Sequence, residues 1–408
     1  MAVILTSSLS SVKYEFCKNN LGTDTNKIIF LKSAGGAAVT YHMQSKLSKG
    51  LFHRGIAQSG TNLAPWGAVA HKNVAREHAV KLGEMMDCPL QNSDYKEMVK
   101  CLKQVSADNI TAAFYDFFKW DTDPMVPFPP VIEHDHENAF ITENPRFAKN
   151  LHGNKIPLMT GLTSDEGVLK SGSLIDNQEL TADLLKNWDR ALPISLYYDH
   201  HSDEKIEEIT RKIDEFYFNN QKLTTDTQTN LTNLWTDAWF MHAMMDYLNI
   251  RFSSEHADTF VYYFSHKGAS SFSEIFKAGS EAYYGTAHAE ELQYLFPIRK
   301  DLPYFFSSIP TEDDKKLSKI MTKLWVNFAY SGNPTPQNVE EKSWSPTSSF
   351  PLDYMRIGNE MKGTKQLLAM ENDLLPARAA FWSELKAHYP ADMTDDSTTT
   401  LKNMKGEL

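Results

Sequence analysis

The sequence predicts an α/β sheet protein, and three observations support this fold class. Strand-like and helix-like segments alternate over most of the 408 residues. No internal repeat and no linker rich in Gly and Ser breaks this alternation. Hydrophobic residues make up 41% of the chain and aromatic residues 12%, which is enough for a sizeable core. The length allows one large α/β domain or two to three small domains.

Five short segments have the pattern of strands that are buried in a sheet. Each is mostly apolar and is bounded by turn residues. The expected strands are 27–31, 54–58, 156–161, 259–264 and 354–357.

The clearest helix begins at Thr311, which forms a capping pair with Asp314. Apolar residues then recur at helical spacing until Gly332 and Pro334 end the helix. We expect a core helix with no chemical role, and a second helix over 377–388.

Charge and hydropathy exclude two classes of partner. Lys and Arg number 41 against 52 Asp and Glu, so the formal net charge of −11 repels nucleic-acid phosphates and anionic lipid surfaces. The apolar region around 235–248 is interrupted by Asp and His residues. We therefore expect no nucleic-acid partner and no membrane-spanning helix.

Several short signals favour a secretory route. The polar tail expected over 391–408 ends in Lys-Gly-Glu-Leu, one residue away from the Lys-Asp-Glu-Leu retrieval signal of the endoplasmic reticulum. Asn109 and Asn230 each begin an acceptor sequon for N-glycosylation. Cys88 and Cys101 close a short loop and could pair in an oxidising compartment, which would leave Cys17 over. The first residues, however, make a poor secretory signal, because they have no basic region and only a short apolar run.

The segment around Ser33 has the layout of a nucleophile elbow. An expected strand leads directly into Ser33, and small residues and a helix-competent stretch follow it. In such an elbow the serine lies in a strained turn, and the start of the helix directs amide donors at the developing oxyanion. Gly35 fits the pattern Gly-x-Ser-x-Gly, whereas Leu31 stands where the first glycine belongs. By itself the segment also fits an ordinary helix N-cap.

A serine nucleophile needs a histidine base and a carboxylate that orients the histidine. Asp165 and Glu166 follow the expected strand 156–161, at the end of a strand where acidic residues of hydrolase sheets lie. His288 lies farther on, in a short loop of small residues. Taken singly, Asp165 and Glu166 also fit exposed loop acids, and His288 also fits a solvated surface histidine.

Together the three segments resemble the type-B carboxylesterase and cholinesterase family. The resemblance rests on Ser-Ala-Gly-Gly at 33–36, Ser-Asp-Glu-Gly at 164–167 and Gly-Thr-Ala-His at 285–288. Separations of 133 residues from Ser33 to Glu166 and of 122 from Glu166 to His288 are similar to those of the family. Further family landmarks are the segments 51–60, 65–66, 332–336 and 381–382.

The resemblance implies an α/β-hydrolase fold over 33–390, with a largely parallel central sheet and helices on both faces. It implies a catalytic triad of Ser33, Glu166 and His288, with Asp165 as a bystander. The motif Gly285-x-x-His288-x-x-Glu291 looks closest to insect carboxylesterases and is shared with juvenile hormone esterases. Residues 1–32 are expected to form an unmatched segment with one strand.

Four further roles follow from the same resemblance. Ala34 would donate its amide to the oxyanion, Ser59 would place a hydroxyl near the triad acid, and Trp66 would form a wall of the acyl pocket. The spacing of Cys88 and Cys101 resembles a family disulfide.

The chain departs from the family in two respects. Leu31 and Lys32 stand where the family has glycine followed by an acid or glutamine, so a branched side chain should crowd the elbow. Lys32 should also disfavour the imidazolium that His288 must become during catalysis. The chain has only thirty-two residues before Ser33, so we expect the sheet to be incomplete on the N-terminal side and the family's upstream oxyanion loop to be missing. Whether this is a natural short form or a truncated one stays open.

The leading hypothesis is a serine hydrolase that cleaves small-molecule carboxylic esters through an acyl-enzyme, with no metal and no cofactor. The alternative is a catalytically silent, truncated form or a noncatalytic binding module of the same fold. A third, metal-dependent interpretation would use the donor clusters 133–137 and 199–201, but neither has the spacing of a zinc site. We expect an address in the endoplasmic reticulum lumen or outside the cell, and the sequence does not specify the oligomeric state.

Overall fold

The computed structural model describes residues 28–67, 72–148, 152–219, 227–276, 283–301, 308–359 and 366–388. Most of the expected N-terminal segment, including Cys17, lies outside the described residues. The polar tail over 391–408 lies outside them as well.

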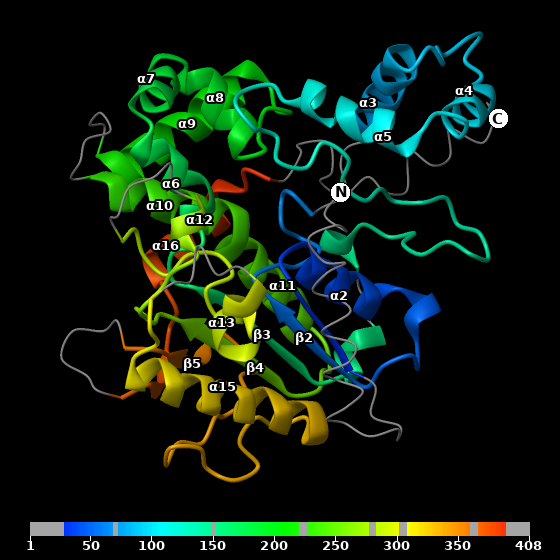
Figure 1. The fold of residues 1–408 in the computed structure, drawn as a ribbon. Coiled ribbons are helices and arrows are strands. Elements are labelled where there is room, and N and C mark those ends of the chain that lie inside the picture. Colours follow the sequence, from blue (N-terminus) through cyan, green and yellow to red (C-terminus); the bar gives the residue numbers. More distant parts are fainter. Residues whose placement is uncertain are drawn as a thin grey trace.

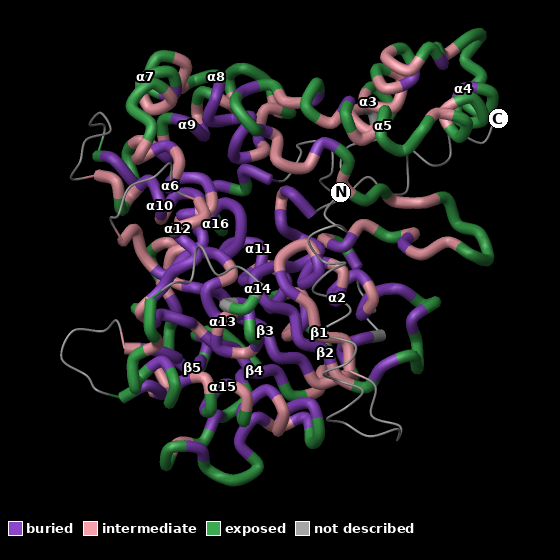
Figure 2. Tube along the Cα trace, in the orientation of Figure 1, coloured by how far each residue is buried: buried purple, intermediate pink, exposed green. Residues whose placement is uncertain are grey.

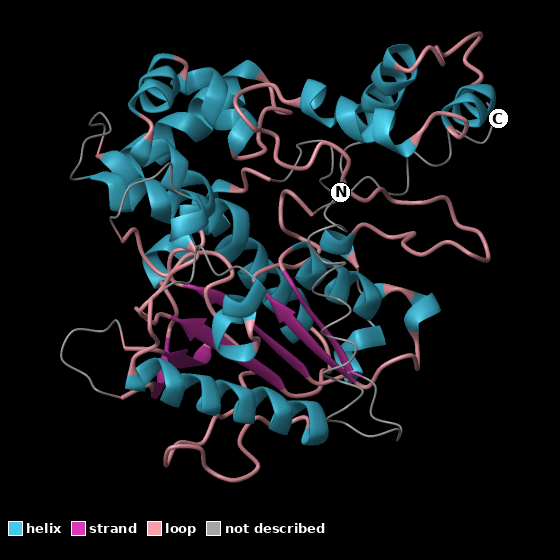
Figure 3. Cartoon of the chain, viewed as in Figure 1, coloured by secondary structure: helices cyan, strands magenta, loops and turns pink. Residues whose placement is uncertain are grey.

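Six strands form one sheet in the order β1 to β6 (Figures 1 and 3). The first five run parallel, and the sixth pairs antiparallel with the fifth. Among the described residues, β1 pairs only with β2 and so lies at an edge of the sheet. The strands are β1 Ile28–Lys32, β2 Arg54–Gln58, β3 Leu158–Thr163, β4 Thr259–Phe264, β5 Asp353–Ile357 and β6 Leu368–Asn372.

The structure confirms the five predicted strands, with shifts of one or two residues at some ends. The largest shift is at β3, because Ile156 and Pro157 precede the first paired residue, Leu158. Strand β6 was not predicted. It is a short edge strand, half-buried over most of its length, so it lacks the continuous apolar pattern that marks the inner strands.

Helices cover both faces of the sheet, as the α/β-hydrolase fold requires. Side chains along β4 alternate between the two faces, because successive side chains of a strand point in opposite directions. Phe260 and Tyr262 pack in one cluster with helix α15 (Glu312–Ser331). Val261 packs in the other cluster, which includes residues of α2 (Ala34–Gln44). The buried residues therefore concentrate at the sheet and at the helices beside it (Figure 2).

Helix α15 begins and ends as its sequence predicts. Thr311 and Asp314 form a complete capping box, and Gly332 ends the helix in the left-handed conformation with φ of 79°. Helix α16 (Pro376–Leu385) confirms the helix predicted over 377–388, but it begins one residue earlier and ends three residues earlier.

Most of the remaining helices form two groups, which extend above the sheet in the view of Figure 1. The larger group lies between β3 and β4 in the sequence and contains a π-helical turn, Asp237–Met241. The smaller group, which we call the arm, contains α3, α4 and α5, and a Cys88–Cys101 disulfide crosslinks it, as expected. The helices of the larger group are α6 Val168–Asp176, α7 Gln178–Lys186, α8 Trp188–Ser195, α9 Asp203–Phe218, α10 Gln228–Thr236 and α11 His242–Phe252. The helices of the arm are α3 Lys72–Met85, α4 Tyr95–Leu102 and α5 Ala107–Ala112. Short helices after β4 are α12 Ser273–Phe276, α13 Leu292–Leu295 and α14 Ile298–Asp301.

The donor clusters of the metal-dependent interpretation serve structural purposes. The Glu133 carboxylate accepts hydrogen bonds from the backbone amides of Phe140 and Ile141. Asp199 forms an ion pair with Lys119 at 2.7 Å. No group of three or more potential metal ligands is found in the part of the chain that the structure describes.

Two other expectations can be placed on the fold. Asn109 is exposed in α5, whereas Asn230 is half-buried in α10. Glycosylation at both positions stays a prediction. None of the described helices is long and apolar enough to cross a membrane.

Candidate active site

Ser33 lies in a strained turn between β1 and α2. Its φ of 59° and ψ of −122° fall in a region that side-chain-bearing residues rarely adopt. A hydrogen bond from the Ser33 amide to the Gln58 carbonyl, at 2.8 Å, fixes the turn against the end of β2. Ala34 begins α2, so its amide is among the first-turn donors that have no acceptor within the helix.

Glycines allow this turn to approach its surroundings closely. A Cβ on Gly60 would lie 2.3 Å from the Ser33 carbonyl oxygen, and a Cβ on Gly36 would lie 2.7 Å from the Gln58 carbonyl oxygen. A Cβ on Gly35 would lie 2.7 Å from the Cβ of Leu31. Because Gly35 has no side chain, space is left for the branched side chain of Leu31. The crowding that was expected at the elbow is therefore avoided.

His288 and Glu166 form a tight buried pair. The Nδ1 atom of His288 lies 2.5 Å from Oε2 of Glu166, and both side chains are buried. Glu166 follows β3, and the Thr163 amide donates to its other oxygen at 2.8 Å. Both residues were candidates from the sequence, and the fold joins them across 122 positions.

Asp165 joins the loop after β3 to the loop that carries His288. Its carboxylate accepts from the Thr286 amide at 2.9 Å, and its own amide donates to the Thr286 carbonyl at 3.1 Å. Gly285, with φ of 116°, leaves no space for a side chain beside Asp165. Asp165 therefore has a structural role, because it positions the loop that carries His288.

The surroundings of Glu166 keep its carboxylate ionised. Burial alone raises the pKa of Glu166, but the charges of His288 and Lys32 and the hydrogen bonds from His288 and Ser59 together lower it to about 2. An ionised carboxylate is what a histidine needs in order to hold its Nδ1 proton and to carry a positive charge transiently.

Lys32 is paired in the structure, contrary to the expectation of an unbalanced cation beside His288. Its ammonium lies 2.7 and 2.8 Å from the two carboxylate oxygens of Glu291, and both side chains are buried. The positive charge is therefore largely neutralised by a partner 259 positions away. The sequence contains Glu291 in the histidine motif, but nothing in its spacing indicates a contact with Lys32.

Aromatic side chains line one side of His288. The Phe240 ring lies 4.9 Å from the His288 ring and 5.6 Å from the Trp66 ring, measured between centroids. The indole of Trp66 donates to the Trp239 carbonyl at 2.9 Å. Phe240 lies on the π-helical turn and was not identified from the sequence, where it is one apolar residue in a long apolar segment. π-turns are rare and often mark functional sites.

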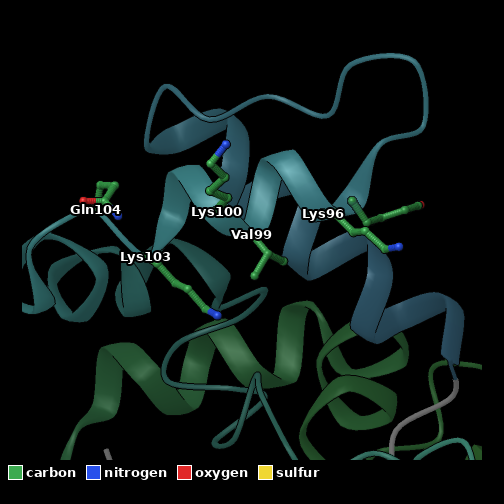
Figure 4. A pocket seen from close by; sticks show the side chains of 6 residues that line it. Lys96, Val99, Lys100, Lys103 and Gln104 are labelled. Atoms are coloured by element: carbon green, nitrogen blue, oxygen red, sulfur yellow. The ribbon is translucent and has the colours of Figure 1, made fainter.

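Ser33 does not hydrogen-bond His288 within the described part of the chain. Catalytic hydrogen bonds are often long in the absence of substrate, so this geometry is compatible with a triad. A surface hollow on the arm, beside α4, lies apart from these residues (Figure 4). It is lined by Tyr95, Lys96, Val99, Lys100, Lys103 and Gln104, and it contributes no residue to the site.

The parallel sheet with helices on both faces, and the serine in a sharp turn from strand to helix, define an α/β-hydrolase. A sequence model described as the carboxylesterase family matches residues 19–382. The chain belongs to the carboxylesterase family. The match begins within the segment 1–32, fourteen residues before Ser33.

Similar proteins come from insects. The chain is 29% identical to venom carboxylesterase-6 of Apis mellifera over 90% of its own length and 63% of that protein. It is 26% identical to juvenile hormone esterase of Tribolium castaneum over 89% of its length and 64% of that protein. Esterase FE4 of Myzus persicae is 29% identical over 82% of this chain and 57% of that protein. The chain thus spans less than two thirds of these relatives.

Proposed function

We propose that this chain hydrolyses carboxylic esters through an acyl-enzyme on Ser33. The observation that carries the proposal is the buried His288–Glu166 pair, formed by the same fold that places Ser33 in a strained turn at the start of α2. Membership of the carboxylesterase family and the names of the relatives support the reaction class.

The proposed reaction assigns a role to each residue. The Ser33 hydroxyl attacks the ester carbonyl while Nε2 of His288 takes its proton, and Glu166 stabilises the imidazolium through Nδ1. The Ala34 amide donates to the oxyanion of the tetrahedral intermediate. The imidazolium then protonates the departing alcohol, and water, activated by His288, releases the acid from Ser33. This scheme requires no metal and no cofactor.

The substrate proposed for this site is a small-molecule ester with an apolar acyl group. Phe240 lies against the His288 ring and Trp66 lies against Phe240, so two aromatic rings could hold an apolar acyl chain near the proposed triad. The names of relatives include a juvenile hormone esterase, which is consistent with an apolar ester but does not identify the substrate of this chain.

The proposed location is the secretory route, either the endoplasmic reticulum lumen or the outside of the cell. Its supports are the Cys88–Cys101 disulfide, since disulfides persist in oxidising compartments, and the name of the venom carboxylesterase among the relatives. Exposure of Asn109 makes that sequon accessible to glycosylation.

The second candidate is a noncatalytic protein of the same fold. It is favoured by one observation, the missing hydrogen bond between Ser33 and His288 among the described residues.

Labelling with a fluorophosphonate probe distinguishes the two candidates. The purified chain, its Ser33→Ala variant and the control Ser348→Ala, an exposed serine, are treated with the probe, and the modified residue is mapped by mass spectrometry. We expect labelling at Ser33 that only Ser33→Ala abolishes. A chain that melts cooperatively but remains unlabelled would establish the noncatalytic candidate instead.

A further inference from the structure

Lys32 uses all three of its ammonium hydrogens behind the candidate triad. Two of them reach Oε1 and Oε2 of Glu291, at 2.7 and 2.8 Å, and the third reaches the Ser59 hydroxyl oxygen at 2.9 Å. An ammonium has three donors and no acceptor, so it is fully satisfied by these partners. Lys32 is buried, and burial of an unpaired cation there would be costly.

The contact with Lys32 fixes the direction of the Ser59 hydroxyl. Because Lys32 can only donate, the Ser59 oxygen must accept from it, and the single hydroxyl hydrogen is left free to donate elsewhere. A hydrogen bond from the Ser59 side chain is among the causes that lower the pKa of Glu166, and an ionised carboxylate can only accept. A chain of hydrogen bonds therefore runs in one direction, from Lys32 through Ser59 to Glu166.

Glu291 balances the charge of Lys32 within this cluster. It accepts further hydrogen bonds from the Gln58 amide at 2.8 Å and from the Tyr262 hydroxyl at 3.2 Å. The ionisable side chains that face the cluster come from β1, β4 and the loops that follow β3 and precede α13. They are Lys32, Tyr262, Glu166, His288 and Glu291, together with Glu290, whose buried carboxyl is repelled by Glu291.

We infer that Lys32 and Glu291 are a matched pair of positioning residues: the ammonium orients Ser59 toward Glu166, and the carboxylate cancels the charge that would otherwise oppose a protonated His288. The inference deepens the proposed esterase function and rests on it for its biological meaning. It also goes beyond that function, because neither residue touches the reacting atoms.

The test is an NMR titration of the His288 imidazole in the purified chain, with ¹³C-labelled histidine and His288→Asn to assign the signal. We expect Glu291→Gln to move the titration midpoint of His288 to lower pH, since it leaves the cation of Lys32 uncompensated. We expect Lys32→Met to move the midpoint to higher pH, and the double variant to restore the wild-type midpoint. Each single shift should be about one pH unit, the lower part of the range for charges that interact at short distance. Lys100→Met, in an exposed ion pair on the arm, should move nothing.

Breaking a buried pair can prevent folding, so a charge-reversed variant completes the design. Lys32→Glu/Glu291→Lys keeps an ion pair with no net charge, so its His288 midpoint should stay near the wild-type value. Shifts of the same sign in both single variants would overturn the inference. A midpoint that moves as far in the charge-reversed variant as in a single variant would overturn it as well.

The titration needs no substrate, so it reports on this cluster even if the chain is catalytically silent. Fluorophosphonate labelling of Ser33 reports on the proposed function separately. A silent chain with the expected titration shifts would contradict the function and leave the paired role of Lys32 and Glu291 in place.

Discussion

At the scale of single residues, the candidate site depends on backbone conformations that are unfavourable by themselves. Ser33 and Ser59 both have positive φ, 59° and 48°, which costs about 1 kcal/mol or more for a residue with a Cβ. Each lies directly after a parallel strand, where the surrounding sheet holds it. Both serines therefore lie at the same edge of the sheet, at the carboxyl ends of its parallel strands.

Gly60→Ala tests how closely the elbow must fit the end of β2. The new Cβ would lie 2.3 Å from the Ser33 carbonyl oxygen, and because that atom is backbone, the turn itself has to move. A displacement of about 1 Å can lower reactivity by about 10²-fold, so we expect the rate of fluorophosphonate labelling to fall on that order. The control is Gly50→Ala, which has φ of 78° but no atom within 4 Å of the added Cβ. It should cost about 1 kcal/mol of stability and leave labelling unchanged, and equal labelling of the two variants would contradict the argument.

At the scale of elements, α16 is attached to the π-helical turn by a buried polar network. Arg378 on α16 donates to both carboxylate oxygens of Asp237, at 2.5 and 2.6 Å. The Tyr217 hydroxyl donates to Asp237 at 2.5 Å and accepts from the Trp382 indole at 2.7 Å. Asp237 begins the turn that carries Phe240, so this network connects α16 with the aromatic wall beside His288.

Arg378→Met should destabilise the chain strongly. It leaves the Asp237 carboxylate buried without its cation, a change that typically costs about 4 kcal/mol. The double variant Arg378→Met/Asp237→Asn removes the orphaned charge, keeps an acceptor for Tyr217, and should recover much of this loss. Urea unfolding midpoints measure both. Lys100→Met breaks an exposed pair and should change little, so a similarly small effect of Arg378→Met would show that Asp237 does not need the cation.

At the scale of the whole molecule, burial of ionisable side chains makes stability depend on pH. Burial raises the pKa of Glu290 to about 8, although hydrogen bonds from Ser271 and Phe272 oppose the rise. Burial lowers the pKa of His242 and His388 below their ordinary values. The two histidines are neutral in the folded chain and take up protons on unfolding, so stability falls as the pH drops below about 6.5.

Glu290 acts in the opposite direction. Its folded pKa of about 8 lies above its ordinary value of 4.5, so its stabilising contribution is complete below pH 4.5 and is lost as the pH rises toward 8. Glu290→Gln resembles the protonated form and cannot ionise. As the pH rises from 5 to 8, we expect the free energy of unfolding of this variant to increase relative to that of the wild type by on the order of a few kcal/mol. Unfolding midpoints measured across that range test this. A constant difference between the two proteins over this range would show that Glu290 does not titrate there.

The sequence by itself determined the class of sheet and most of its strands, because these follow from local patterns. Short apolar runs bounded by turn residues identify inner strands, and a capping box identifies the start of α15. The antiparallel edge strand β6 was not predicted, because its half-buried residues lack that pattern. The three motifs around Ser33, Glu166 and His288 could also be recognised, through their resemblance to the carboxylesterase family, and the triad itself remains a proposal.

Only the tertiary structure decided how distant residues meet. The pairing of Lys32 with Glu291 spans 259 positions, and the placement of Phe240 against His288 depends on a π-turn that no local pattern indicates. The role of Asp165 in joining two loops is likewise invisible in the sequence. The sequence specifies the charge and size of each side chain. Which partner balances a charge or fills a space depends on how the whole sheet and its helices pack.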